Sequence, residues 1–239
     1  MKRLMWLALV MLALGVGSYS AYAAQGRGDP VESKEPNVPA GCVAVPEDVL
    51  DALADAPDEH FHKAHTAFLK KEFKAAAEEI HKGTAFLKLE MARAKGDTGK
   101  AVAASVRELE TLAGDVERGT VTSVGTLEQV FARAHHALAQ HHYARAMEDQ
   151  AKEARVRMGH ALKAAATHLE QGLSWTGKKL EAGTKETLQL AGLVSGKLIQ
   201  GTGYATEEVG KAMGKVGDEI GQFGRRLVPG KPESKVGRP

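Results

Sequence analysis

The sequence predicts an all-α protein: an up-down four-helix bundle followed by a glycine-rich amphipathic helix or helical hairpin. Three observations lead to this prediction. All eight prolines of the 239-residue chain lie at or before Pro57 or at or after Pro229, and proline breaks helices. The stretch between them is rich in Ala, Leu, Glu and Lys, which favour helices. Its apolar residues recur at intervals of three and four, as one face of a helix requires.

Residues 1–23 have the parts of a secretory signal peptide. Lys2 and Arg3 precede a short apolar run, and Ala21-Tyr22-Ala23 forms a small-residue cleavage motif. The apolar run is too short to span a bilayer comfortably. We therefore expect cleavage after this motif and a periplasmic or secreted protein.

The cysteine count and the charge balance exclude several classes of protein. Cys42 is the only cysteine, so no internal disulfide forms and stability must come from packing. The chain has 32 basic and 30 acidic side chains, and loss of Lys2 and Arg3 with the signal leaves it formally neutral. A nucleic-acid binder shows a basic face, so we expect no nucleic-acid partner. Because G-x-S-x-G, phosphate-loop and H-E-x-x-H motifs are absent from the sequence, we predict that the protein is not an enzyme.

The predicted bundle occupies residues 47–172, after a flexible linker at 24–46 that holds glycine, proline and charged residues. Apolar residues at helical spacing define its elements. The four predicted helices cover about 47–69, 72–95, 100–117, and 126 to beyond 169. We expect the fourth helix to be continuous, with a weak point near Gly159.

Residues 173–227 form a segment of different composition, and a tail at 228–239 follows it. The apolar residues of its second half follow the 4-3-4-3 spacing of a coiled-coil seam, and glycines run beside them. Glycine costs about 1 kcal/mol per site in a helix interior, so this stripe indicates close approach by another helix. The predicted interaction surface consists of Val209, Gly210, Met213, Gly214, Val216, Gly217, Ile220, Gly221 and Phe223.

The same segment can be written as five 11-residue units beginning at Leu173. In this periodicity residues 173–227 resemble the 11-residue amphipathic repeats of apolipoproteins and late-embryogenesis proteins. The resemblance implies binding to lipid or to other apolar surfaces. We favour instead a hairpin that turns at Gly201-Thr202-Gly203, in which the glycine faces meet, or docking onto the bundle. We expect a protein partner, self-association or peripheral membrane contact through this segment.

Histidines on the first two predicted helices indicate a possible metal site. If these helices pair antiparallel, His62 lies level with His81, and His65 lies level with Glu78. Imidazole and carboxylate ligands suit zinc, copper or iron, so these four residues are the first candidate ligands. Two Glu-x-x-His pairs are similar to part of the di-iron bundle pattern, but the two further inward glutamates of that pattern are not identifiable. A hydrogen-bonded flank of the bundle is the alternative.

His135 and His142 are seven residues apart on the fourth predicted helix and share its apolar face. We expect both to point inward and their neighbours His136 and His141 to be exposed. A buried imidazole needs a partner, so His135 and His142 either form hydrogen bonds across the bundle or ligate a metal. Haem is not expected, because alanine-rich close packing leaves no large apolar slot.

The histidines also suggest a response to acid. The chain has ten of them, and histidine titrates near pH 6.5. Buried imidazoles resist protonation, so acid would loosen the bundle and free an amphipathic segment. The sequence therefore predicts an exported, non-enzymatic binding or interaction protein. A periplasmic metal-binding protein and an acid-responsive stress protein or chaperone are the alternatives.

Overall fold

A computed structural model describes residues 53–227, and every regular element in this part of the chain is an α-helix. The predicted all-α class is therefore confirmed for these residues. The helices are α2 (Ala56–Leu69), α3 (Phe73–Arg93), α4 (Gly96–Glu117), α5 (Val124–Ala151), α6 (Arg155–Ser174), α7 (Ala182–Gln200) and α8 (Thr206–Leu227). Between residues 53 and 227, no helix has both the length and the hydropathy needed to cross a membrane.

Several sequence predictions lie outside the described residues. These are the signal peptide, the linker, Cys42, the tail and the start of the first helix near residue 47. Within the described part, α2 begins at Ala56, and Pro57 occupies its first turn. Proline is tolerated there because the first amides of a helix have no intrahelical partner.

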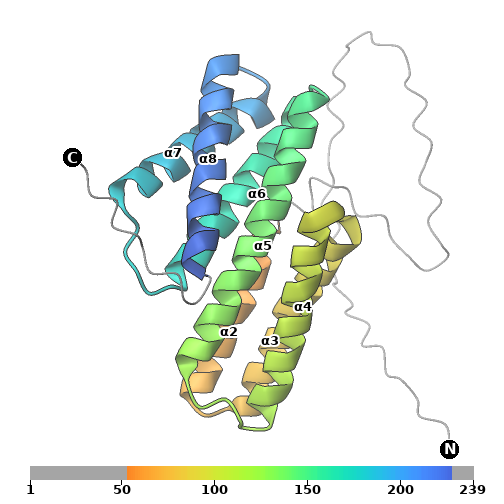
Figure 1. Cartoon of the computed structure of the whole chain (residues 1–239), viewed down its shortest axis with the longest axis vertical. Coiled ribbons are helices and arrows are strands. Elements are labelled where there is room, and N and C mark those ends of the chain that lie inside the picture. Colours follow the sequence, from red (N-terminus) through yellow and green to blue (C-terminus); the bar gives the residue numbers. More distant parts are fainter. Residues whose placement is uncertain (1–52, 228–239) are drawn as a thin grey trace, which may run out of the picture. The chain divides into compact units, whose positions relative to one another are not determined.

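Helices α2, α3, α4 and α5 pack against one another in chain order, and α2 also packs against α5 (Figure 1). Their apolar faces share one core. Phe61 of α2 and Phe131 of α5 are fully buried and stack with their ring centroids 4.4 Å apart. Truncating such a ring to alanine typically costs about 3–5 kcal/mol, so this contact fixes α2 on α5.

The long fourth helix predicted from the sequence is wrong, because the chain turns back between Ala151 and Arg155. Glu153 in this turn has a φ of 56°, which lies in the left-handed region. Side chains other than glycine reach that region only at a cost, and no glycine or proline marks the turn in the sequence. The expected weak point, Gly159, lies inside α6 instead.

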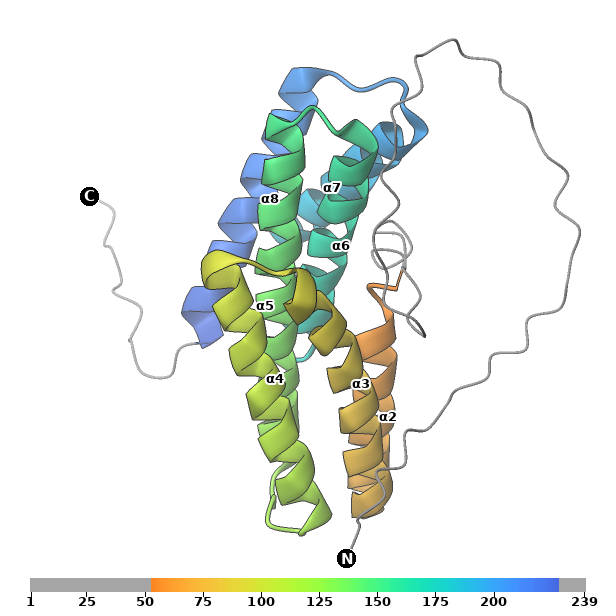
Figure 2. The ribbon, with the colours of Figure 1, turned by 90° about the vertical axis from the view of Figure 1, so that its right-hand side faces the viewer.

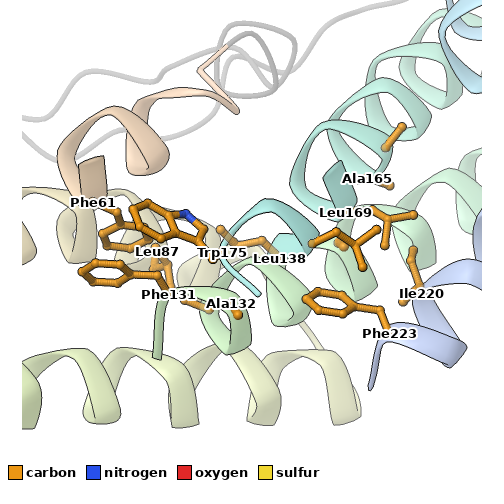
Figure 3. Close-up of a cluster of buried hydrophobic side chains, with 14 of the residues drawn as sticks. Phe61, Leu87, Phe131, Ala132, Leu138, Ala165, Leu169, Trp175, Ile220 and Phe223 are labelled. Carbon is orange, nitrogen blue, oxygen red and sulfur yellow. The ribbon is translucent and has the colours of Figure 1, made fainter. Parts of the chain in front are cut away.

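Helix α5 packs against helices on both sides of it. Its 28 residues correspond to a length of about 42 Å, and it contacts α2, α4, α6 and α8 (Figure 2). Between Val130 and His142 most residues are buried and none is exposed, on every face of the helix. Figure 3 shows side chains gathered in two places, with Phe61, Phe131 and Trp175 in one and Leu169, Ile220 and Phe223 in the other.

Helices α7 and α8 contact each other, and they also pack onto α5 and α6. The apolar ladder of α8 is buried in these contacts, and it comprises Val209, Met213, Val216, Ile220 and Phe223. The glycines beside it differ in their surroundings. A Cβ atom on Gly217 would lie 2.5 Å from the hydroxyl oxygen of Tyr143, and one on Gly224 would lie 2.6 Å from Nε2 of His136. Gly210 and Gly214 have no atom within 4 Å of that position, and Gly221 meets only Arg225 at 3.6 Å.

The contact between α6 and α7 depends on Gly159, and this gives a test of the packing. A Cβ atom there would lie 2.9 Å from Leu198 Cβ and 3.0 Å from the carbonyl oxygen of Ser195. We expect Gly159→Ala to lower the free energy of unfolding by about 1–3 kcal/mol, as overpacking does. Gly192→Ala on the facing helix meets nothing within 4 Å and should raise it by about 1 kcal/mol. Urea denaturation measures both values, and a gain in both variants would contradict the close approach.

Candidate functional site

Four imidazole rings lie one after another in the interior, and we call them the histidine line. In spatial order they are His135, His168, His142 and His141. Successive ring centroids are 5.5, 5.3 and 5.2 Å apart, and no ring belongs to a residue more than 2% exposed. His168 comes from α6 and the other three come from α5. Such burial is uncommon for histidine and requires partners for the ring nitrogens.

The sequence predicted part of this line. The inward orientation of His135 and His142 is confirmed by their burial. The expected exposure of His141 is wrong, because α5 has packed neighbours on that side as well. His136 is half-buried, and its Nε2 lies 3.1 Å from the carbonyl oxygen of Ile220 in α8. His168 was missed, although it follows Ala164 and Ala165 on an alanine-rich helix, where an imidazole at the spacing of the buried alanines is a detectable signal.

Asp58 of α2 closes one end of the histidine line. Its Oδ1 lies 3.1 Å from Nε2 of His135 and accepts a hydrogen bond of 2.7 Å from the indole N–H of Trp175. Its Oδ2 lies 3.2 Å from Nε2 of His62. Burial alone would raise the pKa of Asp58, but the hydrogen bond and charge of His135, with the Trp175 hydrogen bond, lower it overall. Asp58 is therefore a carboxylate at neutral pH.

Gln171 fixes which nitrogen carries the proton in the middle of the line. Its amide nitrogen donates to Asp55 Oδ1 at 2.8 Å, so its carbonyl oxygen faces Nδ1 of His168, 3.2 Å away. Since this oxygen only accepts, Nδ1 of His168 carries a proton. Nδ1 of His135 lies 3.3 Å from Nδ1 of His168 and accepts a hydrogen bond from it. His135 then carries its own proton on Nε2, which faces the Asp58 carboxylate.

Glu90 of α3 closes the other end. Its Oε2 lies 3.2 Å from Nε2 of His141 and 3.8 Å from Nε2 of His142. Arg93, one turn further along α3, places Nη1 3.5 Å from Oε1 of Glu90. Arg145 and Asp149 of α5 are also buried at this end, and Arg157 of α6 lies 3.4 Å from Asp149.

The interior of the line holds uncharged imidazole. Burial, and after it electrostatic repulsion from the neighbouring site at His135, lowers the pKa of His168 to about 3. Burial, and after it electrostatic repulsion from the sites at His168 and His141, lowers the pKa of His142 well below its usual value. Burial also lowers the pKa of His136 beside α8. The folded protein therefore excludes protons that the same rings would take up in water near pH 6.5.

The first metal-site candidates do not come together. His62 is exposed beside the ring of Trp175, and Nε2 of His65 lies 3.2 Å from Glu128 on α5. Glu78 and His81 are both exposed on α3. The reason is the rotation of α2 against α3, which turns His62 and His65 away from α3.

The pair that joins these two helices is His60 with Glu79, at 2.8 Å, in place of the predicted pairs. The second candidates, His135 and His142, are separated by the ring of His168. Across residues 53–227, no three histidine, cysteine, aspartate or glutamate side chains converge as ligands of one metal ion.

The histidine line should make stability depend on pH. Below pH 6.5 the unfolded chain protonates these rings while folded His142 and His168 stay neutral, so acid favours unfolding. Each ring contributes a slope of about 1.4 kcal/mol per pH unit, and the two together about 2.7. We expect urea denaturation at pH 5.5 and 4.5 to show this loss. His168→Gln should halve the slope, whereas His81→Gln, an exposed control on α3, should leave it unchanged. Equal slopes in all three proteins would contradict the assignment.

No known protein family, curated protein sequence or solved structure matches this chain.

Proposed function

We propose that this is an exported, non-enzymatic interaction protein that is closed at neutral pH and opens in acid. The observation that carries the proposal is the histidine line, in which four imidazoles are buried between two carboxylates. We take α2–α5 as an up-down bundle onto which α6–α8 pack. The signal peptide predicted at residues 1–23 supports export, and export places the histidines where external acid reaches them.

Acid acts on the contact between His135 and His168. The accepting Nδ1 of His135 faces the protonated Nδ1 of His168 at 3.3 Å. A proton added to the accepting atom turns both nitrogens into donors, and the hydrogen bond is lost. The two N–H groups then point at each other, and their partial positive charges repel in a medium of low dielectric. This contact joins α5 to α6, so the two helices are driven apart where the line crosses between them.

The same event weakens the packing of α8 on α5 and α6. Gly172 of α6 lies between Phe223 of α8 and His135 of α5: a Cβ atom on it would be 2.6 Å from the Phe223 ring and 3.0 Å from His135 Cβ. Movement of α6 away from α5 removes this fit. His136 is a second link, since it contacts both the carbonyl oxygen of Ile220 and the ring of Phe223.

The surface that becomes available is the apolar ladder of α8. In the closed state Val216 and Phe223 are almost fully buried, so a partner cannot reach them. Once α8 is released, its apolar face and its charged opposite face suit binding to another helix, to a second copy or to a membrane surface. The predicted interaction residues of this segment therefore act in the open state.

Hydrogen exchange of residues 206–227 at pH 7.5 and 5.0, corrected for the intrinsic rate, tests the opening. We expect strong protection at pH 7.5 and clear loss of protection at pH 5.0. Sedimentation velocity and flotation with phosphatidylcholine vesicles then test the interaction, and we expect self-association or vesicle binding only at pH 5.0. If α8 stays protected in acid, the proposal is wrong. If it opens but binds nothing, the interaction role is rejected and the acid response stands.

The matched variant is His142→Leu/His168→Leu, which removes the N–H group that a protonated His135 would face, together with the second buried ring that stays neutral in the folded protein. We expect it to keep α8 protected at pH 5.0 and to stay monomeric. Circular dichroism at pH 7.5 shows whether it folds. Should it fail to fold, the single variant His168→Leu serves instead, and its opening should be shifted to lower pH.

A further inference from the structure

A pocket of about 360 Å³ lies where α5 and α7 begin and where α6 and α8 end. We infer that it binds a single-chain amphiphilic anion, such as a medium-chain carboxylate, with the apolar chain inside and the anionic group at the mouth. This inference does not depend on the acid response, because the side chains placed against the ligand lie outside the histidine line and the test is made at neutral pH.

The walls of the pocket are suited to an apolar chain. Its apolar lining comes from four segments of the chain and consists of Ala132, Leu173, Trp175, Leu180 and Leu227. The volume lies within the range of about 300–1,000 Å³ typical of small-molecule sites. Trp175 is held rigidly, because its indole N–H donates to Asp58 and its ring packs edge-on against Phe131 at 5.1 Å. The pocket is therefore largely formed before a ligand binds.

The charges around the pocket favour an anion. Four cationic side chains and two carboxylates line it: Arg133, Lys178, Lys179, Arg226, Glu128 and Glu181. Arg226 pairs with Glu181 at 3.3 Å, and Arg133 forms a forked pair with Glu108 outside the pocket. Glu128 faces His65.

Two lysines remain for a ligand. Lys178 and Lys179 are exposed and form no hydrogen bond or ion pair with any residue of the described range 53–227. The first turn of α7 also borders the pocket through Thr184 and has no acidic side chain, and its N-cap residue Glu181 is paired with Arg226. The free amides of a helix N-terminus attract negative charge. The anionic group is therefore placed beside the two lysines and the start of α7.

Trp175 is a direct reporter of occupancy. The chain has two tryptophans, so Trp6→Phe in the full-length protein leaves Trp175 as the single emitter. We expect octanoate, decanoate and dodecanoate, added below their micelle concentrations at pH 7.5, to change its fluorescence saturably. Each added methylene should tighten binding by about fourfold, because this factor corresponds to the transfer free energy of a buried CH₂ group. Decylammonium of the same chain length should bind at least tenfold more weakly than decanoate.

Variants separate the head-group contacts from the apolar pocket. In the Trp6→Phe background, Lys178→Gln/Lys179→Gln should weaken decanoate binding about tenfold and leave binding of neutral decanol unchanged. Lys163→Gln/Lys211→Gln removes two exposed lysines elsewhere on α6 and α8 and is the matched control, which should behave like the parent. Non-saturable fluorescence changes, or equal affinity for decanoate and decylammonium, would overturn the inference. So would equal decanoate affinity in the two lysine variants.

Discussion

The carboxylate of Asp58 holds together parts of the structure that are far apart in the sequence. One of its oxygens faces Nε2 of His135 at 3.1 Å and accepts the hydrogen bond of Trp175 at 2.7 Å. The first contact joins α2 to α5 and fits the tautomer of His135 that Gln171 imposes through His168. The second joins α2 to the residue that ends α6 and forms a wall of the pocket. Breaking a buried charge–partner contact of this kind typically costs several kcal/mol, so the site depends on it.

Burying imidazoles in place of aliphatic side chains has a thermodynamic consequence. A neutral imidazole has one donor and one acceptor, so a line of such rings is satisfied only when each proton points in the right direction. Gln171 and Asp58 impose that direction at one end, and the carboxylate of Glu90 lies 3.2 Å from Nε2 of His141 at the other. An apolar core would give equal or better stability without this requirement. What the histidines add is sensitivity to protons.

The sequence predicted the helices better than it predicted the site. The expected segments 72–95 and 100–117 correspond closely to α3 and α4, because glycine breaks and apolar spacing both mark them. The turn at Glu153 could not be predicted, since it has no glycine or proline to mark it, and its left-handed backbone is stabilised by local backbone hydrogen bonds and by packing of α6 on α5. Helical spacing identified inward His135. It failed for His141, because a helix packed on all sides has no outward face.

Local sequence patterns could not predict the contacts between helices. His168 and His135 are 33 positions apart in the chain, and their contact exists only because α6 folds back along α5. The pairing of α2 with α3 also differs from expectation: His60 meets Glu79, since a small rotation about the α2 axis selects which histidine faces the partner helix. Such rotations are set by core packing, here by Phe61 stacked on Phe131, and side-chain spacing alone does not fix them.

The pocket and the histidine line share one hydrogen bond, so their equilibria are linked. Trp175 lines the pocket and donates to Asp58, and Asp58 faces the first ring of the line. An anion that binds best when Trp175 is held by Asp58 stabilises the closed state and therefore opposes protonation of the line. Linkage is reciprocal: acid must then weaken binding of the anion by the same factor by which the anion suppresses opening. A protein built in this way would release an amphiphilic anion and expose α8 in a single acid-driven step.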